Sequence, residues 1–146
     1  MIYKTILVAH DFSDSGTKAF HRALALAKEF DAQLHLLHVV EYIVPIDTSF
    51  GAISPFDGDL TDQLLDSARK RLQHLGQKHG IVADHCRVEL GSPKIEIIRI
   101  AEMVKADLII LGCHGRHGLG LLLGSTAASV VNHADCDVLS VRHDPK

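Results

Sequence analysis

The stretch from residue 108 to residue 126 decides the fold, and it reads Leu108-Ile-Ile-Leu-Gly112-Cys-His-Gly115-Arg-His-Gly118-Leu-Gly120-Leu-Leu-Leu-Gly124-Ser125-Thr126. Its first four residues form an apolar run that is typical of a buried strand. A glycine-rich loop follows, and Ser125-Thr126 then opens a helical segment that extends to Ala134. Glycines let main-chain N–H groups approach an anion closely, and a helix N-terminus adds unpaired N–H groups and the positive end of a dipole. The stretch therefore predicts a phosphate-binding loop.

The spacing of the glycines excludes two common nucleotide motifs. A Walker loop ends in Gly-Lys-Ser/Thr, and no lysine stands beside Gly124-Ser125. A dinucleotide fingerprint has the spacing G-x-G-x-x-G after the first strand, whereas Gly118, Gly120 and Gly124 are spaced G-x-G-x-x-x-G after the fourth. Any phosphate site in this loop is therefore of another kind.

Short apolar runs alternate with helical patterns along the whole chain. Strands are expected at 4–9, 33–40, 84–90, 108–111 and 138–141, and helices at 17–30, 60–79, 93–105 and from 125 onward. In the third helix, the spacing predicts that Ile95, Ile98 and Ala101 face inward, with Met103 or Val104. The order predicts an α/β fold with a doubly wound five-stranded parallel sheet, and the simplest right-handed arrangement has strand order 3-2-1-4-5.

This sheet order predicts where a ligand binds. Open α/β sheets bind ligands beyond the carboxyl ends of the strands, at the point where the strand order reverses. That point lies between strands one and four, and the loops that leave these strands are 9–13 and 112–124. Asp11 and the glycine loop are therefore expected at one crevice.

The composition narrows the class of protein. The 146 residues suffice for one domain over 1–146, and a formal net charge of −3 gives no reason to expect a nucleic acid or an anionic membrane as partner. No apolar run is long enough to span a bilayer. The first residues read as a strand and not as a signal peptide, and three widely spaced cysteines form no disulfide framework. A cytoplasmic location is therefore expected.

Several segments resemble the universal stress protein family. The opening strand ends Val8-Ala-His-Asp11-Phe-Ser13, where the family has V-P/A-x-D-x-S. Gly112-x2-Gly115 and Gly124-Ser125 match the signature of the members that bind nucleotide, but the spacer between them, 116–123, has eight residues where the family has nine. The resemblance covers nearly the whole chain and implies an adenine nucleotide alpha hydrolase-like fold.

The resemblance also implies a set of residues that contact a nucleotide. Asp11 would accept a hydrogen bond from a ribose hydroxyl or the adenine amino group, and the main chain of Val39 would face the adenine. Ser125 and Thr126 would donate to phosphate oxygens, and Arg116 is the one cation inside the loop. The full expected set is Ala9, Asp11, Val39, Leu111, Gly112, His114, Gly115, Arg116, Gly124, Ser125 and Thr126.

Each of these residues also has a purely structural explanation. Asp11 suits an Asx-turn or a helix cap, Ser125 or Thr126 suits an ordinary N-cap, and the glycines suit a tight turn with positive φ. The alternative for Arg116 is a solvated charge in the loop. Cys113, His114 and His117 are metal-ligating types, but no second cluster at metal spacing accompanies them, so no metal site is predicted.

Binding without efficient turnover is the function that these features favour. The sequence has no Ser-His-Asp arrangement, no paired carboxylates near the loop and no lysine for a γ-phosphate. We therefore expect a regulatory protein that binds ATP or AMP, with Mg²⁺ held through the phosphates, while weak hydrolysis or autophosphorylation stays open. The alternative is a dimeric stress-response interaction protein of the UspA type that binds no nucleotide. The resemblance implies a homodimer through strand five, Val138 to Val141.

Overall fold

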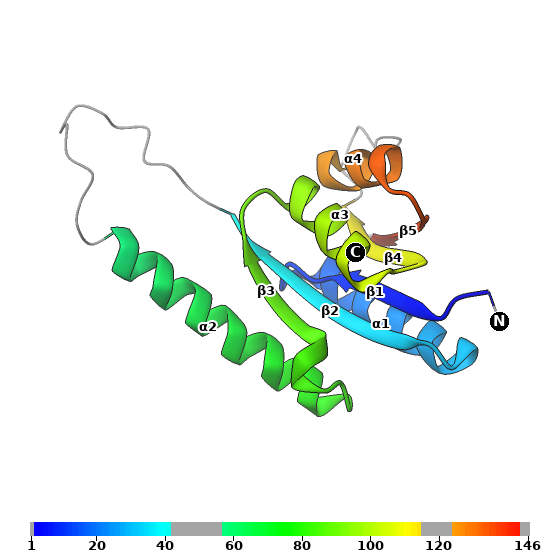
Figure 1. The fold of residues 1–146 in the computed structure, drawn as a ribbon, viewed down its shortest axis with the longest axis horizontal. Coiled ribbons are helices and arrows are strands. Elements are labelled where there is room, and N and C mark those ends of the chain that lie inside the picture. The colour runs from blue at the N-terminus through cyan, green and yellow to red at the C-terminus, as the bar shows by residue number, and fades with distance from the viewer. Residues whose placement is uncertain (1, 42–56, 115–123, 144–146) are drawn as a thin grey trace.

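The five strands form one parallel sheet in the order β3-β2-β1-β4-β5, as the sequence predicts. The computed structural model describes residues 2–41, 57–114 and 124–143 (Figure 1). The strands are β1 Thr5–Ala9, β2 Gln33–Val40, β3 Cys86–Leu90, β4 Leu108–His114 and β5 Asp137–His143. Strands β1 and β4 are adjacent at the centre, so the strand order reverses between them.

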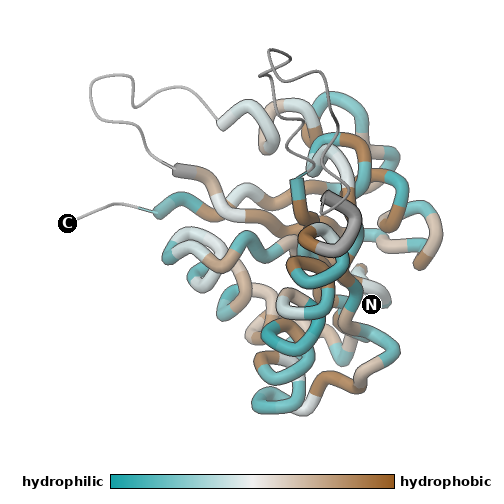
Figure 2. Tube along the Cα trace, turned by 90° about the vertical axis from the view of Figure 1, so that its left-hand side faces the viewer, coloured by the Kyte–Doolittle hydropathy of each residue, from teal (hydrophilic) through white to brown (hydrophobic). Residues whose placement is uncertain are grey.

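Helices cover both faces of the sheet. Helices α1 (Asp14–Phe30) and α2 (Asp57–Lys78) lie on one face, and α3 (Pro93–Val104) and α4 (Ser125–His133) lie on the other (Figure 1). In Figure 2, hydrophobic and hydrophilic residues alternate along the helices, as expected when one side of each helix packs on the sheet. None of these described helices is long and apolar enough to cross a membrane.

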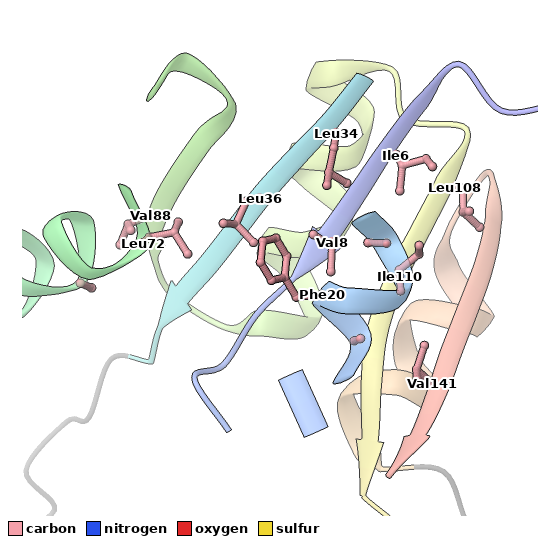
Figure 3. Packing of buried hydrophobic residues seen from close by; sticks show 13 residues of the cluster. Ile6, Val8, Phe20, Leu34, Leu36, Leu72, Val88, Leu108, Ile110 and Val141 are labelled. Carbon is pink, nitrogen blue, oxygen red and sulfur yellow. The ribbon is translucent and has the colours of Figure 1, made fainter. Parts of the chain in front are cut away.

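Two apolar layers hold the helices to the sheet. Beneath α1 and α2, Phe20 is fully buried against Val8 and Leu36, with Leu72 of α2 beside them (Figure 3). Side chains of a strand point alternately to the two faces, so the neighbouring strand residues form the second layer under α3 and α4. That layer contains Leu7, Leu37, Ile97, Ile100, Ile109, Leu111, Ala127 and Val130.

Several element boundaries differ from those predicted. Strand β4 continues three residues past Leu111 because it pairs with β5 as far as His114 and His143. Strand β3 begins at Cys86 instead of residue 84, because a 3-10 turn occupies Ala83–His85. Helix α2 begins at Asp57, three residues before the predicted start. The extension of β4 is the one that affects the site.

The inward face of α3 was predicted only in part. Ala101 is buried and Val104 packs partly buried beside it, as predicted, but Ile95 is 65% exposed and Met103 is 48% exposed, and Ile97 and Ile100 are buried instead. Apolar residues occupy most positions of this short helix, so periodicity alone does not identify the face that meets the sheet.

Candidate functional site

The carboxyl edge of the sheet opens between β1 and β4. The described pairing of β1 with β4 ends at Val8 and Ile110, while β4 and β5 remain paired up to His114. The two central strands therefore diverge at the point where the strand order reverses. In doubly wound sheets this divergence creates the ligand crevice.

Strand β2 directs the main-chain groups of Val39 toward the same crevice. The His10 N–H donates to the Leu37 carbonyl at 2.8 Å, so Leu37 directs its main-chain groups toward β1. The Val40 carbonyl accepts from the Gly91 N–H at 2.9 Å, on the side of β3. Because main-chain groups alternate in direction along a strand, Val39 directs its N–H and carbonyl to the same side as Leu37. The β1 pairing has already ended there, so both groups face the crevice.

A cavity of about 360 Å³ occupies the crevice. Eight of the predicted site residues line it, namely Ala9, Asp11, Val39, Leu111, Gly112, Gly124, Ser125 and Thr126. His114 is the last residue of β4, and its side chain is not among the described parts of the chain. Gly115 and Arg116 lie outside the described residues.

Six further residues line the cavity that the sequence did not indicate as site residues. They are His10, Leu37, Glu41, Pro93, Ile97 and Ala127. Leu37 and Glu41 flank Val39, and Pro93 opens α3 directly after the edge strand β3. Ser92-Pro93 is a typical helix start, with serine as N-cap and proline as the first helical residue. Together with the sheet order, it indicates that the N-terminus of α3 lies at this edge. The sequence alone could not place Ile97 and Ala127 at the cavity, because that requires knowing which faces of α3 and α4 point toward the sheet.

The Asp11 carboxylate belongs to a tight turn. Its Oδ1 accepts the Ser13 N–H at 3.0 Å and also the Ser13 hydroxyl, while Ser13 caps α1 by accepting the Gly16 N–H at 3.0 Å. Asp11 thus makes the Asx-turn that was the structural alternative for this residue. The side chain is exposed and lines the cavity, so the turn and a ligand contact are compatible.

Helix α4 directs its first N–H groups toward the cavity. Gly124 is the N-cap, with no side-chain cap bond, and Ser125 is the first helical residue, so the N-cap explanation of Ser125 and Thr126 is wrong. The first bond from the helix to its cap runs from the Ala128 N–H to the Gly124 carbonyl at 2.9 Å. The N–H groups of residues 125–127 precede that bond, and all three residues line the cavity. Such groups, with the positive end of the helix dipole, favour an anion.

Gly112 and Gly124, two glycines of the signature, have different structural surroundings. A Cβ on Gly112 would lie 2.3 Å from the Ser15 Oγ and 2.7 Å from the Ser15 carbonyl oxygen, so this glycine lets α1 pack on β4. Gly112 does not have the positive φ that a tight turn would need. A Cβ on Gly124 would meet no described atom within 4 Å, and its φ of −58° suits any residue. The fold therefore requires glycine at 112 but not at 124.

The charged residues that line the cavity, among those that the structure describes, are Asp11 and Glu41. Lys94 lies in an adjoining groove with Gly91 and Ser92 at the N-terminus of α3. Among the described residues, no group of three His, Cys, Asp or Glu side chains is arranged to hold a metal ion. The described walls are therefore apolar and acidic, and the helix dipole is their main source of positive potential.

Known proteins with similar sequences identify the family. A sequence model of the universal stress protein family matches residues 2–142. The chain belongs to the universal stress protein family. It is 40% identical over 141 residues to Universal stress protein A homolog 2 of Coxiella burnetii, covering 96% of this chain and 95% of that protein. It is 34% identical over 157 residues to Universal stress protein MJ0531 of Methanocaldococcus jannaschii, covering 99% and 85%.

Three solved structures share the fold, two of them described as universal stress proteins. UspA from Lactobacillus plantarum has a TM-score of 0.64 at 30% identity, with 97% of this chain and 99% of that chain covered. Hypothetical protein MJ0577 has a TM-score of 0.78 at 25% identity, with 100% of both chains covered. A universal stress protein solved in complex with cAMP has a TM-score of 0.62 at 25% identity, with 97% and 98% covered.

Proposed function

We propose that this universal stress protein binds an adenine nucleotide, ATP or AMP, in the cavity between β1 and β4, as a regulatory ligand and not as a substrate for rapid turnover. The main support for the proposal is that three features lie at one cavity of about 360 Å³. They are apolar walls, main-chain groups of β2 that face the cavity and the N-terminus of α4. The similarity to a universal stress protein in complex with cAMP supports the same ligand class.

The base would lie on the β2 side of the cavity. Leu37, Ile97 and Leu111 are buried apolar residues that line it, and they suit the face of an aromatic ring. Val39 offers one N–H and one carbonyl side by side, which complement the ring nitrogen and amino group at the edge of adenine. A base that reverses this donor and acceptor order, such as guanine, is expected to bind more weakly.

The phosphates would lie at the N-terminus of α4. Gly124 leaves open space where other residues carry a Cβ, and the fold itself does not need that space. Ser125 and Thr126 add hydroxyl groups beside their N–H groups. Asp11 and Glu41 repel a highly charged ligand, so we expect Mg²⁺ to strengthen the binding of ATP more than that of AMP.

Gly124→Ser tests this proposal. Serine is a better N-cap than most residues and fits the backbone conformation at 124, so the variant should unfold at the same temperature as the wild type or slightly above it. Its side chain fills the space next to the phosphates and competes for the same N–H groups. Calorimetric titration should therefore give AMP and ATP affinities about tenfold or more weaker, a loss of roughly 1.4 kcal/mol or more. Unchanged affinity with retained stability would overturn the phosphate site.

We also propose that the protein is a cytoplasmic homodimer through β5. This strand lies at an edge of the sheet, where a strand of a second copy can pair with it. Light scattering should report twice the chain mass of 15.9 kDa. A monomer at micromolar concentration would contradict the dimer without affecting the nucleotide site.

A further inference from the structure

A buried histidine lies directly behind the cavity. His10 follows β1 and is only 4% exposed. Its ring packs 5.9 Å from the Phe20 ring of α1, measured between centroids, so the side chain points to the α1 and α2 face of the sheet. The apolar wall of the cavity is formed by residues of the opposite face. The His10 ring therefore lies on the side of the sheet opposite to the apolar wall, while the residue itself borders the cavity, so the ring can act on the site through the main chain.

The His10 ring fixes the turn that carries Asp11. Its Nδ1 accepts the Phe12 N–H at 2.8 Å, which requires an unprotonated Nδ1. Phe12 has a φ of +63°, a left-handed conformation that costs a residue with a side chain about 1 kcal/mol or more. A hydrogen bond to the Phe12 N–H offsets that cost. Asp11 stands between the two bonded residues, so the bond constrains the main chain from which the Asp11 carboxylate extends toward Ser13.

Contacts from two other elements hold the same turn. His38 of β2 donates its Nδ1–H to the His10 carbonyl at 2.7 Å. The Phe12 ring lies 4.3 Å from the His38 ring, and the Arg71 guanidinium of α2 lies 4.1 Å from the Phe12 ring centroid. Gly16 of α1 leaves the room that the turn needs, since a Cβ there would come within 2.5 Å of the Asp11 Oδ1.

We propose that His10 is a positioning residue for nucleotide binding, which holds the Asp11 carboxylate toward the ligand hydroxyls by accepting the Phe12 N–H from behind the sheet. The inference rests on the proposed function of the cavity. This positioning role requires a hydrogen-bond acceptor for the Phe12 N–H at the position of Nδ1. It does not require a charged or bulky ring. Burial lowers the pKa of His10 to about 4, so the ring is uncharged and Nδ1 is free to accept at neutral pH.

Two substitutions of His10 separate positioning from packing. Leucine fills the buried space but accepts no hydrogen bond, whereas the Oδ1 of asparagine reaches the place of the histidine Nδ1. We expect AMP affinity to fall about tenfold in His10→Leu and less than about threefold in His10→Asn, in proportion to the loss of one hydrogen bond. Hydrogen exchange of the Phe12 amide should be accelerated in His10→Leu and remain slow in His10→Asn. Thermal unfolding establishes that each variant is folded.

A double-mutant cycle with Asp11→Ala tests whether His10 acts through Asp11. Asp11→Ala alone should weaken AMP binding about tenfold or more, and His10→Leu should then weaken it by less than about threefold further. Additive losses, or equal affinities for wild type and His10→Leu, would overturn the positioning role while leaving the nucleotide site intact. If the wild type binds no nucleotide, the proposed function fails, and the positioning role fails with it.

Discussion

The glycines at 112 and 124 are equivalent in the family signature but not in the fold. Gly112 lies under the first turn of α1, where the Ser15 main chain leaves no room for a Cβ. Gly124 borders the cavity, and a Cβ there would meet no atom of the described residues within 4 Å. A signature glycine can thus serve helix packing or ligand approach, and only the three-dimensional neighbours distinguish the two.

Gly112→Ala should destabilise the protein severely. The added Cβ would lie 2.7 Å and 2.8 Å from the Ser15 carbonyl oxygen and carbon, which a side-chain rotation cannot relieve. We expect a loss of about 2–4 kcal/mol in the free energy of unfolding, measured by urea denaturation. Removing the Ser15 hydroxyl in Ser15→Ala should not restore the loss, because the contact is with the main chain. A stable Gly112→Ala protein would contradict the close packing of α1 on β4.

One buried and one half-buried histidine predict how stability depends on pH. Desolvation lowers the pKa of His10 to about 4, and desolvation together with the nearby His85 and Arg87 lowers that of His35 to about 4. The Asp11 charge acts in the opposite direction on His10, while His38 of β2, Arg71 of α2 and His21 of α1 act with burial. Between pH 6.5 and pH 4 the unfolded chain therefore binds protons that the folded protein does not.

Stability should consequently fall as the pH is lowered from 6.5 toward 4. Each of the two histidines makes its full contribution to the free energy of unfolding above pH 6.5. That contribution is lost as the pH falls through this window, and for His10 the loss is on the order of 1 kcal/mol per pH unit. Urea denaturation at several pH values should show a shallower dependence in His10→Leu than in the wild type. A substitution of the exposed His74 to Gln serves as the control. An identical slope in His10→Leu would contradict the buried, uncharged state of His10.

At the scale of elements, a single carboxylate holds the start of β1 against the start of β4. The Asp107 carboxylate accepts the Lys4 N–H at 2.9 Å and the Thr5 N–H at 3.2 Å, and the Asp107 N–H donates to the Thr5 carbonyl at 2.9 Å. These bonds extend the pairing of the two central strands below Ile6 and Leu108, where the ladder begins.

Asp107→Ala should cost about 1–2 kcal/mol in the free energy of unfolding, because it leaves two main-chain N–H groups without this acceptor. Asp107→Asn keeps one acceptor oxygen and should cost less. Hydrogen exchange of the Thr5 amide should accelerate in both variants, more in the alanine one. Equal stability of all three proteins would show that the bonds from Lys4 and Thr5 contribute nothing to the central pair.

The sequence predicted the elements better than their orientation. The strand order and the bounds of β2 follow from alternation of apolar runs and turn signals, which act locally. The buried face of α3 does not follow, because Ile95, Ile97 and Ile100 are equally apolar and only the sheet beneath the helix distinguishes them. The position of His10 behind the site depends on contacts with β2 and α1 at once, so no local pattern reveals it.

For the whole molecule, topology explains why one edge of the sheet carries the candidate site. Parallel strands place all their carboxyl ends at one edge, and the helix N-termini that follow lie at that edge as well. Asp11, Val39 and Gly124 come from distant parts of the chain yet line the same cavity. The eight predicted residues that line the cavity lie at strand ends or at a helix start, and Val39 was expected among them only through the family resemblance.

The opposite edge of the sheet offers an internal control for the site. A groove there is lined by residues of α1 and of the segment after α2, including Lys28, His79 and His85. It lies at the amino ends of the strands, so a nucleotide that binds at the point of strand reversal should leave it unaffected.

Titration of AMP into the isotopically labelled wild-type protein, followed by amide chemical shifts, is the most direct measurement of the nucleotide site. We predict saturable shifts at residues 9–11, 39–41, 111–112 and 124–127, with little change at residues 79–85. Absence of shifts at millimolar AMP in the folded protein, or shifts confined to residues outside the cavity, would contradict the nucleotide site. That result would favour the alternative of a dimeric interaction protein that binds no nucleotide.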